Sequence, residues 1–511
     1  MPHLSITAKQ TPAKPAYIMA NSGQVVTYGE LDDKSNQIAQ LFRLCGLKKG
    51  DHIAMMLLNC GEFLQIASAA MRTGIIFTPI STHLKADETA YILENCGARL
   101  FVTSAQLGDV ASELIKKAPK IERFYMVGGV REGFESWEET VDFLAPDPVD
   151  DQAMGAPMVY SSGTTGQPKG VYVAPRTEAF DAPGQLTDTI GAAFGFSTET
   201  TYLSPAPLYH AAPLHYNLLT LDTGGTSVIM EKFDPERALQ LIEEHRVTHS
   251  QWVPIMFVRM LKLPEEVRKR YDISSMQLAI HSAAPCSVEV KEQMIDWWGP
   301  VIMEYYSSSE GAGFTIIDSN TWLQHKGSVG KPLFGVPHIV DEEGNELPPG
   351  EVGTVYFSDL PSQFAYHNEP GKTADAYNAA GWSTCGDVGY LDEDGFLFLT
   401  DRRNFTIITG GVNVYPAEIE NALINHDKVA DVAVFGVPDD EFGESVQAVV
   451  QPVSWADATD ETAIELLEWL RQRLSGVKVP RHLDFQQQLP RLDNGKLYKR
   501  HLMEAYRNRE S

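Results

Sequence analysis

The chain has 511 residues, 43% of them hydrophobic and 21% charged, which is typical of a globular protein with about two to four domains. Its formal charge of −27 disfavours nucleic-acid phosphate and anionic membrane surfaces as partners. No apolar run is long enough to span a bilayer, the five scattered cysteines indicate free thiols, and the N-terminus lacks the apolar core of a signal peptide. We therefore expect a cytoplasmic protein with no integral membrane segment.

The first half of the chain alternates strand and helix patterns. Thr27 and Glu30 form a capping-box pattern that predicts the start of a helix. The segments "HIAMMLL" (52–58) and "IIFTPI" (75–80) are typical of buried strands, and this β-α-β rhythm predicts an α/β fold with a largely parallel sheet. The predicted helix has apolar residues at helical spacing: Leu31, Ile38, Phe42 and Cys45.

The character of the sequence changes after residue 327, where "VGTVYFSD" and "GFLFLT" predict strands separated by turns. We predict a large N-terminal domain (1–402) built of αβ-sandwich layers, with a β-rich part at about 327–402. A small, mobile α+β C-terminal domain (403–511) follows. One helix of this small domain is expected to carry Ile464, Leu467, Leu470 and Leu474 on one face.

The segment "SSGTTGQPKG" (161–170) has the composition of a polyphosphate cradle. Its glycines let the backbone approach an anion closely, its hydroxyls donate hydrogen bonds, and Lys169 adds a positive charge. A flexible linker has a similar composition, but linkers rarely lie between two strand-like runs such as "APMVY" and "VYVAP". The segment is not a Walker A loop, because Lys169 follows Pro168 and precedes Gly170.

The longer pattern "YSSGTTGQPKG" resembles the phosphate loop of the adenylate-forming superfamily. That superfamily comprises acyl-CoA synthetases, firefly-type luciferases and the adenylation domains of nonribosomal peptide synthetases. The resemblance covers nearly the whole chain and implies ATP, Mg²⁺ and coenzyme A as cofactors. It assigns to ATP binding the residues Ser161, Ser162, Gly163, Thr164, Thr165, Gly166 and Lys169.

Further segments resemble the adenine, metal and ribose sites of the same superfamily. "AAP" and "EYYSSSEG" look like the adenine-binding segments, where Glu310 would ligate Mg²⁺. The superfamily usually has Tyr-Gly-x-Thr-Glu here, so Ser307 and Ser309 are departures. By resemblance Asp387 accepts hydrogen bonds from the ribose hydroxyls and Arg402 supports the sugar or the α-phosphate. The adenine-site residues are Ala283, Ala284, Pro285, Glu304, Tyr305, Tyr306, which would stack on adenine, and Ser309.

The C-terminal segments resemble the mobile part of these enzymes. Asn404 falls at the hinge position, where Asp or Lys is common. Gly410 and Gly411 would pass close to the pantetheine arm of coenzyme A. Lys496, in "LPRLDNGKLYKR", would contact the substrate carboxylate and the α-phosphate. The resemblance implies that the small domain rotates between the two steps of the reaction.

The segment "APLYHAAPLHY" (206–216) bears on the choice of acid. His210 matches the position where acyl-CoA synthetases have an aromatic or histidine gate, and it is a predicted catalytic residue with Lys169 and Lys496. Relatives that activate amino acids have an aspartate there, but no acidic residue lies between Ser204 and Thr220. We expect a hydrophobic carboxylic acid: a fatty, aryl or steroid-side-chain acid. Residues expected to line its pocket are Trp252, Ile255, Met256 and Phe257.

The implied reaction has two steps. The carboxylate attacks the α-phosphorus of ATP and pyrophosphate leaves, then a thiol attacks the acyl adenylate and AMP leaves. Three alternatives stay open: an enzyme that loads a carrier protein, a luciferase-like oxygenase, and a non-enzymatic ATP-binding protein. A homo-oligomer is also compatible with the sequence.

The role of Lys496 can be tested with Lys496→Ala. Adenylation should fall about 10²- to 10³-fold, because a charge contact to the reacting phosphate is lost. Thioester formation from a preformed acyl adenylate should be spared, because that step is expected to use the other face of the small domain. Equal losses in the two half-reactions, measured separately, would reject the assignment.

Overall fold

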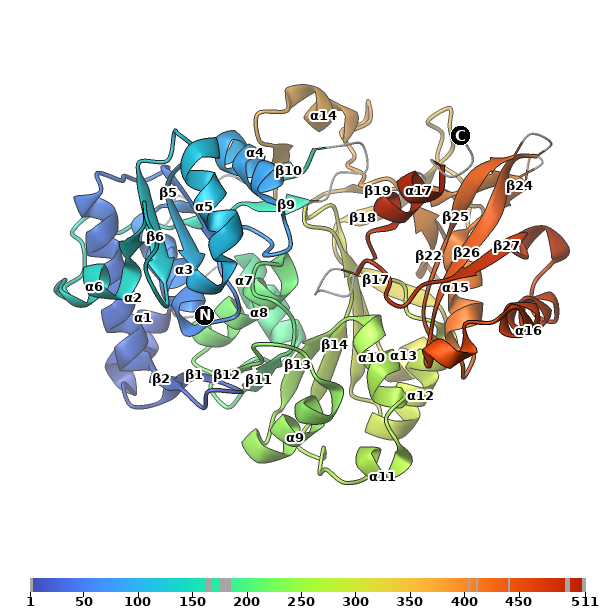
Figure 1. The fold of residues 1–511 in the computed structure, drawn as a ribbon, viewed down its shortest axis with the longest axis horizontal. Coiled ribbons are helices and arrows are strands. Elements are labelled where there is room, and N and C mark those ends of the chain that lie inside the picture. Colours follow the sequence, from blue (N-terminus) through green and yellow to red (C-terminus); the bar gives the residue numbers. More distant parts are fainter. Residues whose placement is uncertain are drawn as a thin grey trace.

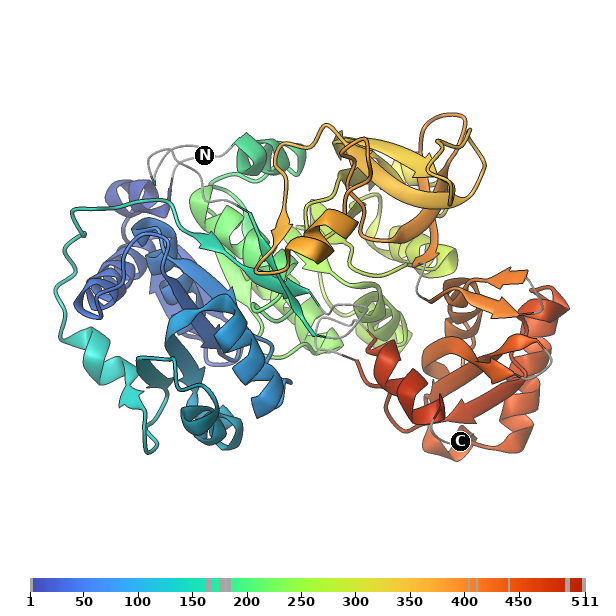
Figure 2. The same cartoon turned by 90° about the horizontal axis from the view of Figure 1, so that it is seen from above.

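The computed structural model shows a mixed α/β protein with a large N-terminal part and a smaller C-terminal part (Figure 1). The elements after residue 405 group together at one end of the molecule in both views (Figures 1 and 2). The structure describes residues 3–161, 167–173, 180, 185–402, 405–409, 412–439, 442–491 and 497–507.

The N-terminal region forms a parallel sheet that is covered by helices. Within the described ranges this sheet has six strands, in the order β7-β6-β5-β3-β4-β8. The strands are β3 (His52–Met56), β4 (Ile76–Pro79), β5 (Ala98–Ser104), β6 (Arg123–Val127), β7 (Glu135–Ser136) and β8 (Ala156–Pro157). The helices are α1 (Leu4–Gln10), α2 (Tyr28–Leu44), α3 (Gly61–Thr73), α4 (Ala86–Cys96), α5 (Gly108–Lys117) and α6 (Trp137–Asp142).

Helix α2 begins at the predicted capping box. The Thr27 hydroxyl accepts a hydrogen bond from the Glu30 backbone N–H (3.3 Å), and the Glu30 carboxylate accepts one from the Thr27 N–H (2.8 Å). Two backbone donors that the helix cannot satisfy internally are thereby paired. Three of the predicted apolar positions, Leu31, Ile38 and Phe42, are fully buried in the core between α2 and the sheet.

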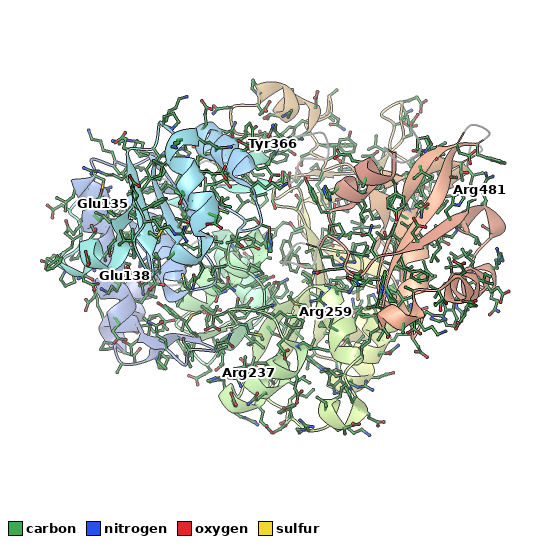
Figure 3. The ribbon with its side chains drawn as sticks, in the orientation of Figure 1. Glu135, Glu138, Arg237, Arg259, Tyr366 and Arg481 are labelled. Atoms are coloured by element: carbon green, nitrogen blue, oxygen red, sulfur yellow. The ribbon has the colours of Figure 1, made fainter. Side chains whose placement is uncertain are left out.

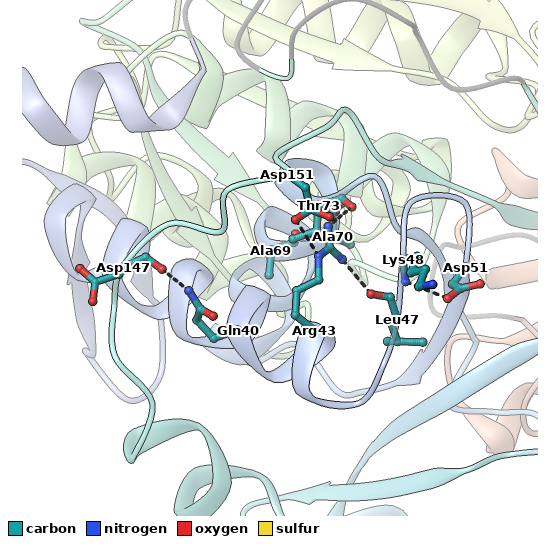
Figure 4. Close-up of polar contacts among 10 residues, drawn as sticks. All are labelled: Gln40, Arg43, Leu47, Lys48, Asp51, Ala69, Ala70, Thr73, Asp147 and Asp151. Carbon is teal, nitrogen blue, oxygen red and sulfur yellow. Dashed lines mark hydrogen bonds and ion pairs between the residues drawn. The ribbon is translucent and has the colours of Figure 1, made fainter.

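Arg43 near the end of α2 joins three segments (Figure 4). Its guanidinium donates to the carbonyls of Leu47 (3.1 Å) and Thr73 (2.9 Å) and to the carboxylate of Asp151 (2.9 Å). Because Thr73 ends α3 and Asp151 lies in the segment leading to β8, one side chain fixes the approach of the chain to the phosphate-loop region. Gln40, one turn earlier, donates to the carbonyl of Asp147 (2.7 Å).

A second, larger sheet carries the centre of the molecule. Among the described residues its strand order is β18-β19-β21-β22-β17-β16-β15-β14-β13-β11-β12-β1-β2. The strands from β12 to β15 run parallel, and β15 pairs antiparallel with β16. The first six strands along the chain are β1 (Pro15–Met19), β2 (Val25–Thr27), β11 (Thr201–Ser204), β12 (Thr226–Ile229), β13 (His249–Trp252) and β14 (Leu278–His281). The others are β15 (Ile302–Ser307), β16 (Phe314–Asp318), β17 (Ser328–Phe334), β18 (Val336–Val340), β19 (Gly353–Ser358), β21 (Asp387–Leu391) and β22 (Leu397–Arg402).

The helices that follow these strands pack on the large sheet or beside it. Their bounds are α7 (Gln185–Ala193), α8 (Ala211–Asp222), α9 (Pro235–His245), α10 (Pro254–Leu261), α11 (Glu265–Arg268), α12 (Val288–Trp298), α13 (Ser319–Trp322) and α14 (Pro370–Asp375). Within the part of the chain that the structure describes, no helix combines the length and apolar character needed to cross a bilayer. All five cysteines are described, and none forms a disulfide.

A short antiparallel sheet joins the phosphate-loop region to a distant segment. Its strands are β9 (Val159–Ser161), β10 (Lys169–Tyr172) and β20 (Ala365–Tyr366), with β10 in the middle. The pairing places Val171 opposite Tyr366, although 195 positions separate them along the chain. Strand β10, which begins with the last two residues of the predicted phosphate loop, is therefore held on one side by β20.

The C-terminal elements form their own sheet and core. The strands are β23 (Ile407–Thr409), β24 (Val412–Val414), β25 (Val429–Asp439), β26 (Gly443–Pro452) and β27 (His482–Phe485). The helices are α15 (Pro416–Ile424), α16 (Asp460–Arg471) and α17 (Lys499–Arg507). Described contacts with the N-terminal part include two hydrogen bonds, from Asn425 to Glu289 (3.1 Å) and from the Lys262 ammonium to the Val429 carbonyl, and the packing of Ile424 against an N-terminal apolar cluster.

The predicted α/β class is confirmed, but the apolar residues expected on one face of α16 match its buried face only in part. The buried residues of α16 are Thr462, Leu466 and Leu470, spaced four apart, whereas Ile464 is 56% exposed. Leu474 lies beyond the end of the helix. The prediction relied on the larger apolar side chains, whereas the face that packs on the sheet begins at Thr462 and continues every four residues.

Candidate active site

A cavity of about 670 Å³ lies at the carboxyl ends of parallel strands of the large sheet. Its wall includes Gln251 near the end of β13, Ala283 just after β14 and Tyr305 near the end of β15. Open α/β sheets bind ligands at this edge, because the strands and the loops after them present their polar groups there. The cavity brings together seven of the predicted site residues: Ser161, Lys169, His210, Ala283, Tyr305, Ser309 and Glu310.

Several predicted residues lie outside the described residues, and their assignments stay predictions. They include the greater part of the phosphate loop, the hinge position, the paired glycines and the C-terminal lysine. Arg402 is described as the last residue of β22, where its backbone pairs with that of Asp387. The residues outside the described ranges are Ser162, Gly163, Thr164, Thr165, Gly166, Asn404, Gly410, Gly411 and Lys496.

Lys169 and Glu310 face the same cavity and share a neighbour, Tyr366. The Lys169 ammonium lies over the Tyr366 ring, 4.5 Å from its centroid. The Tyr366 hydroxyl donates a hydrogen bond to the Glu310 carboxylate (3.0 Å). Sequence reasoning did not find Tyr366, because no local motif marks it and only the pairing of β10 with β20 brings it to the site.

The two tyrosines of "EYYSSSEG" point to opposite faces of β15, as alternation along a strand requires. Tyr305 lines the cavity and stacks on Phe314, with centroids 4.9 Å apart. Tyr306 donates a hydrogen bond to the Asp387 carboxylate (2.6 Å), which is 7% exposed. The predicted adenine and ribose residues thus contact each other, but neither is among the residues that line the cavity.

Two small residues shape the cavity wall. Ser307 stands where the superfamily usually has glycine, and its hydroxyl donates to the Gly313 carbonyl (2.8 Å), so the extra atoms fix the turn after β15. Ala283 has a φ of 74°, a left-handed conformation that disfavours a side chain. Of the predicted "AAP" segment, Ala283 lines the cavity, whereas Ala284 and Pro285 do not.

Glu304 was predicted as a nucleotide ligand, but its carboxylate is buried in an ion pair instead. It accepts a hydrogen bond from the Lys291 ammonium of α12 (2.6 Å), which is fully buried. Burial raises the pKa of the Glu304 carboxyl above its usual range, and Lys291 opposes this rise. A contact of Glu304 with nucleotide would have to come from its backbone, and the ion pair instead connects α12 to the strand that carries Tyr305.

Helix α8 supplies another part of the wall, and here sequence reasoning was incomplete. His210 occupies the N-cap position of α8 and lines the cavity. His215 and, at the end of the helix, Asp222 also line it. Asp222 lies two positions beyond the segment searched for an acidic residue. Helical spacing from His210 predicts that Asp222 faces the same side, because residues 210, 214, 218 and 222 lie on one face of a helix.

The expectation that Trp252, Ile255, Met256 and Phe257 line the apolar pocket is wrong, because none of them lines the cavity. Trp252 and Phe257 are fully buried and pack on each other and on Trp298 of α12, with the rings 5.6 to 6.4 Å apart. A central parallel strand is covered on both faces, so a large side chain on it packs into the core and not the cavity. The cavity wall takes Gln251 and Val253 from this segment instead, and its apolar part comes from Ile190, Tyr216, Phe314 and Phe334.

The residues around Glu310 fit a hard divalent cation. The half-buried Glu310 carboxylate and the Ser308 and Ser309 hydroxyls line the same stretch of wall. Carboxylate and hydroxyl oxygens, completed by phosphate oxygens and water, are the donors that Mg²⁺ prefers. The carboxylate also has the hydrogen-bond partner that ligating carboxylates usually have.

Comparison with known proteins identifies the family. A model described as AMP-binding enzyme matches residues 4–360, and one described as AMP-binding enzyme C-terminal domain matches residues 418–496. The chain belongs to this family. Feruloyl-CoA synthase of Amycolatopsis sp is 31% identical over 495 residues, with 96% of each chain covered. The fatty acid–[acyl-carrier-protein] ligase ScoC of Streptomyces coeruleorubidus is 30% identical, with 98% of this chain and 95% of ScoC covered.

Solved structures agree with this family assignment. ATP-bound MatB from Rhodopseudomonas palustris superposes over 100% of both chains with a TM-score of 0.81 and 25% identity. The membership in the adenylate-forming superfamily and the class of AMP-forming acid–thiol ligase are therefore confirmed. Because this AMP-binding enzyme is a ligase, the alternative of a non-enzymatic ATP-binding protein is set aside.

The buried ion pair gives a stability prediction. In Lys291→Met the Glu304 carboxylate loses its charged partner and keeps only the His281 imidazole at 3.6 Å, whose pKa burial lowers. The free energy of unfolding should therefore fall by about 3–5 kcal/mol at about pH 8. Because the pKa of Glu304 is already raised by burial and rises further without Lys291, the folded variant takes up a proton that the unfolded chain does not. Its stability should therefore recover as the pH falls toward about 5.5.

Urea unfolding at the two pH values measures this effect, with wild type as the reference. The double variant Lys291→Met/Glu304→Gln should recover much of the loss at the higher pH, because no buried charge is left. An equal loss at both pH values, with no recovery in the double variant, would show that the charge of Glu304 is not the cause.

Proposed function

We propose that the enzyme converts a hydrophobic carboxylic acid to its acyl-CoA through an acyl-AMP intermediate, with release of AMP and pyrophosphate. The observation that supports this proposal most directly is that one cavity holds a lysine, a carboxylate and loop hydroxyls beside an apolar wall. The lysine, the carboxylate and the hydroxyls suit a nucleotide polyphosphate with its metal ion. The apolar wall suits the hydrocarbon part of an acid.

The first step brings together two anions, the acid carboxylate and the α-phosphate. Lys169, the backbone donors of the loop 162–166 and Lys496 are proposed to offset their repulsion and to stabilise the charge that develops on the phosphate oxygens. Mg²⁺, when bound by Glu310, would supply further charge neutralisation to the phosphates. The chain's own residues otherwise hold and orient the two reactants, since this reaction asks for little proton transfer.

The nucleoside and the second step rest on further proposals. Tyr306 and Asp387, joined by a hydrogen bond, are proposed to bind adenine and ribose together, with Arg402 beside them. The domain formed by residues 403–511 is proposed to rotate about Asn404 once the adenylate has formed. Gly410 and Gly411 would then face the cavity and admit the pantetheine arm of coenzyme A. Two of its described contacts with the N-terminal part are single hydrogen bonds, which a rotation can break at little cost.

The acid is proposed to be aryl or fatty, because aromatic and aliphatic side chains line its side of the cavity. The relatives that act on ferulate and on fatty acids support the same range. Because Asp222 lines the cavity, the wall does contain a carboxylate of the kind that would pair with the ammonium group of an amino acid. A steroid-side-chain acid remains within the proposed class.

A panel of acids in the ATP–pyrophosphate exchange assay tests the substrate class. We expect exchange with hydroxycinnamic, benzoic or medium- to long-chain fatty acids. Acetate and malonate should be slower by about two orders of magnitude or more, since each missing methylene group in an apolar pocket costs about 1–3 kcal/mol. Amino acids serve as the control for Asp222. Activity confined to short polar acids would overturn the apolar assignment.

A carrier protein is the second candidate acceptor, because ScoC, whose name gives an acyl carrier protein as its acceptor, is 30% identical to this chain. With the acid found above, thioester formation should be measured against free CoA and against a holo-acyl-carrier protein at matched concentrations. We expect CoA to be used with at least about a tenfold higher kcat/KM. A preference for the carrier protein would reverse the assignment of the acceptor and leave the adenylation step intact.

A further inference from the structure

Tyr366 contacts both of the charged residues that the proposed function places at the phosphates and the metal. Its ring face lies against the Lys169 ammonium, 4.5 Å from centroid to Nζ. Its hydroxyl donates to Glu310 Oε1 at 3.0 Å. The ring is only 8% exposed, so both contacts are made in a largely dry setting, where cation–π and charge-assisted hydrogen bonds are strongest.

The position of Tyr366 is fixed by strand pairing and by packing within its own segment. Strand β20 pairs with β10, which carries Lys169, and places Tyr366 opposite Val171. The Tyr366 backbone N–H donates to the hydroxyl of Thr373 within α14 (2.9 Å). The Phe364 ring packs edge-on against the Tyr366 ring, with centroids 5.4 Å apart. Tyr366 is labelled in Figure 3.

Lys169 and Glu310 carry opposite charges and line one cavity, so a direct ion pair between them would compete with ligand. Such a pair would remove the cation from the phosphates and the carboxylate from the metal at once. Within the described part of the chain, Lys169 forms no ion pair with a carboxylate. Each of the two charges is instead held by a different part of the same tyrosine, the cation by the ring and the carboxylate by the hydroxyl.

We propose that Tyr366 is a positioning residue that holds Lys169 and Glu310 apart, so that the first serves the phosphates of ATP and the second serves Mg²⁺. This inference rests on the proposed function, because it takes from that proposal the roles of Lys169 and Glu310. Its hydroxyl orients the carboxylate as the hydrogen-bond partners of metal ligands do, and loss of such a partner typically weakens metal affinity by about 10–100-fold.

Two variants of the full chain separate the roles of the ring and the hydroxyl. Isothermal titration calorimetry measures the affinity for ATP in EDTA and again in excess Mg²⁺. In Tyr366→Phe the affinity in EDTA should stay within about twofold of wild type, because the ring still holds Lys169. The gain in affinity on adding Mg²⁺ should fall about tenfold, because the carboxylate is no longer oriented. In Tyr366→Leu both affinities should fall.

Tyr377→Phe is the matched control. The Tyr377 hydroxyl also stabilises this segment, since it donates to the Phe364 carbonyl (2.8 Å) and accepts from the Phe364 N–H (3.1 Å), but it does not line the cavity. If Tyr366 acted only by stabilising the segment, Tyr377→Phe would reduce the Mg²⁺ gain as much as Tyr366→Phe. Equal losses in these two variants, or an unchanged gain in Tyr366→Phe, overturn the inference.

The test of Tyr366 can be distinguished from a test of the proposed function. Wild type should be tested in parallel for ATP–pyrophosphate exchange with the acid panel. No exchange with any acid, together with a reduced Mg²⁺ gain in Tyr366→Phe, contradicts the proposed function and supports the role of Tyr366 in binding metal and nucleotide. Exchange by wild type with no change in the Mg²⁺ gain contradicts the role of Tyr366 alone. If Tyr366→Leu fails to fold, Tyr366→Phe decides the question.

Discussion

Lys169 and Glu310 lie at the same cavity of a strongly acidic chain, and each is held by Tyr366 and not by the other. The rest of the site depends on this separation of charge. A chain with a formal charge of −27 repels the anions that it has to bind, so its few positive groups have to be placed where the phosphates lie. If a carboxylate of the protein paired with such a positive group, that group would no longer attract the phosphates of the substrate.

The topology of the sheets explains why the site forms where it does. The parallel strands β13, β14 and β15 end at one edge, and the loops that follow them supply the cavity wall. The short sheet of β9, β10 and β20 closes the other side and brings Lys169 to Tyr366. Inside the wall, the buried pair of Lys291 and Glu304 fixes α12 to β15, and thereby the strand that presents Tyr305.

Local patterns predicted what local interactions decide. The capping box at Thr27 and the strands at residues 52 and 76 were predicted from the sequence because their signals lie within a few neighbouring residues. The phosphate-loop motif predicted the family because its long sequence of residue types is specific to that family. Pairings between distant segments could not be predicted in the same way. Tyr366 reaches the site through β-pairing, Glu304 turns to Lys291, and Trp252 packs into the core, and none of these contacts has a signature within its own segment.

The central claim is that the acid is activated by transfer to AMP, and isotope transfer tests it most directly. The substrate acid is prepared with ¹⁸O in its carboxylate, and the enzyme is supplied with ATP, Mg²⁺ and coenzyme A. If the carboxylate oxygen attacks the α-phosphorus, the AMP that is released carries one ¹⁸O atom from the acid, as mass spectrometry would detect. Unlabelled AMP together with labelled phosphate or pyrophosphate would contradict the account, because the acid would then have reacted at another phosphorus.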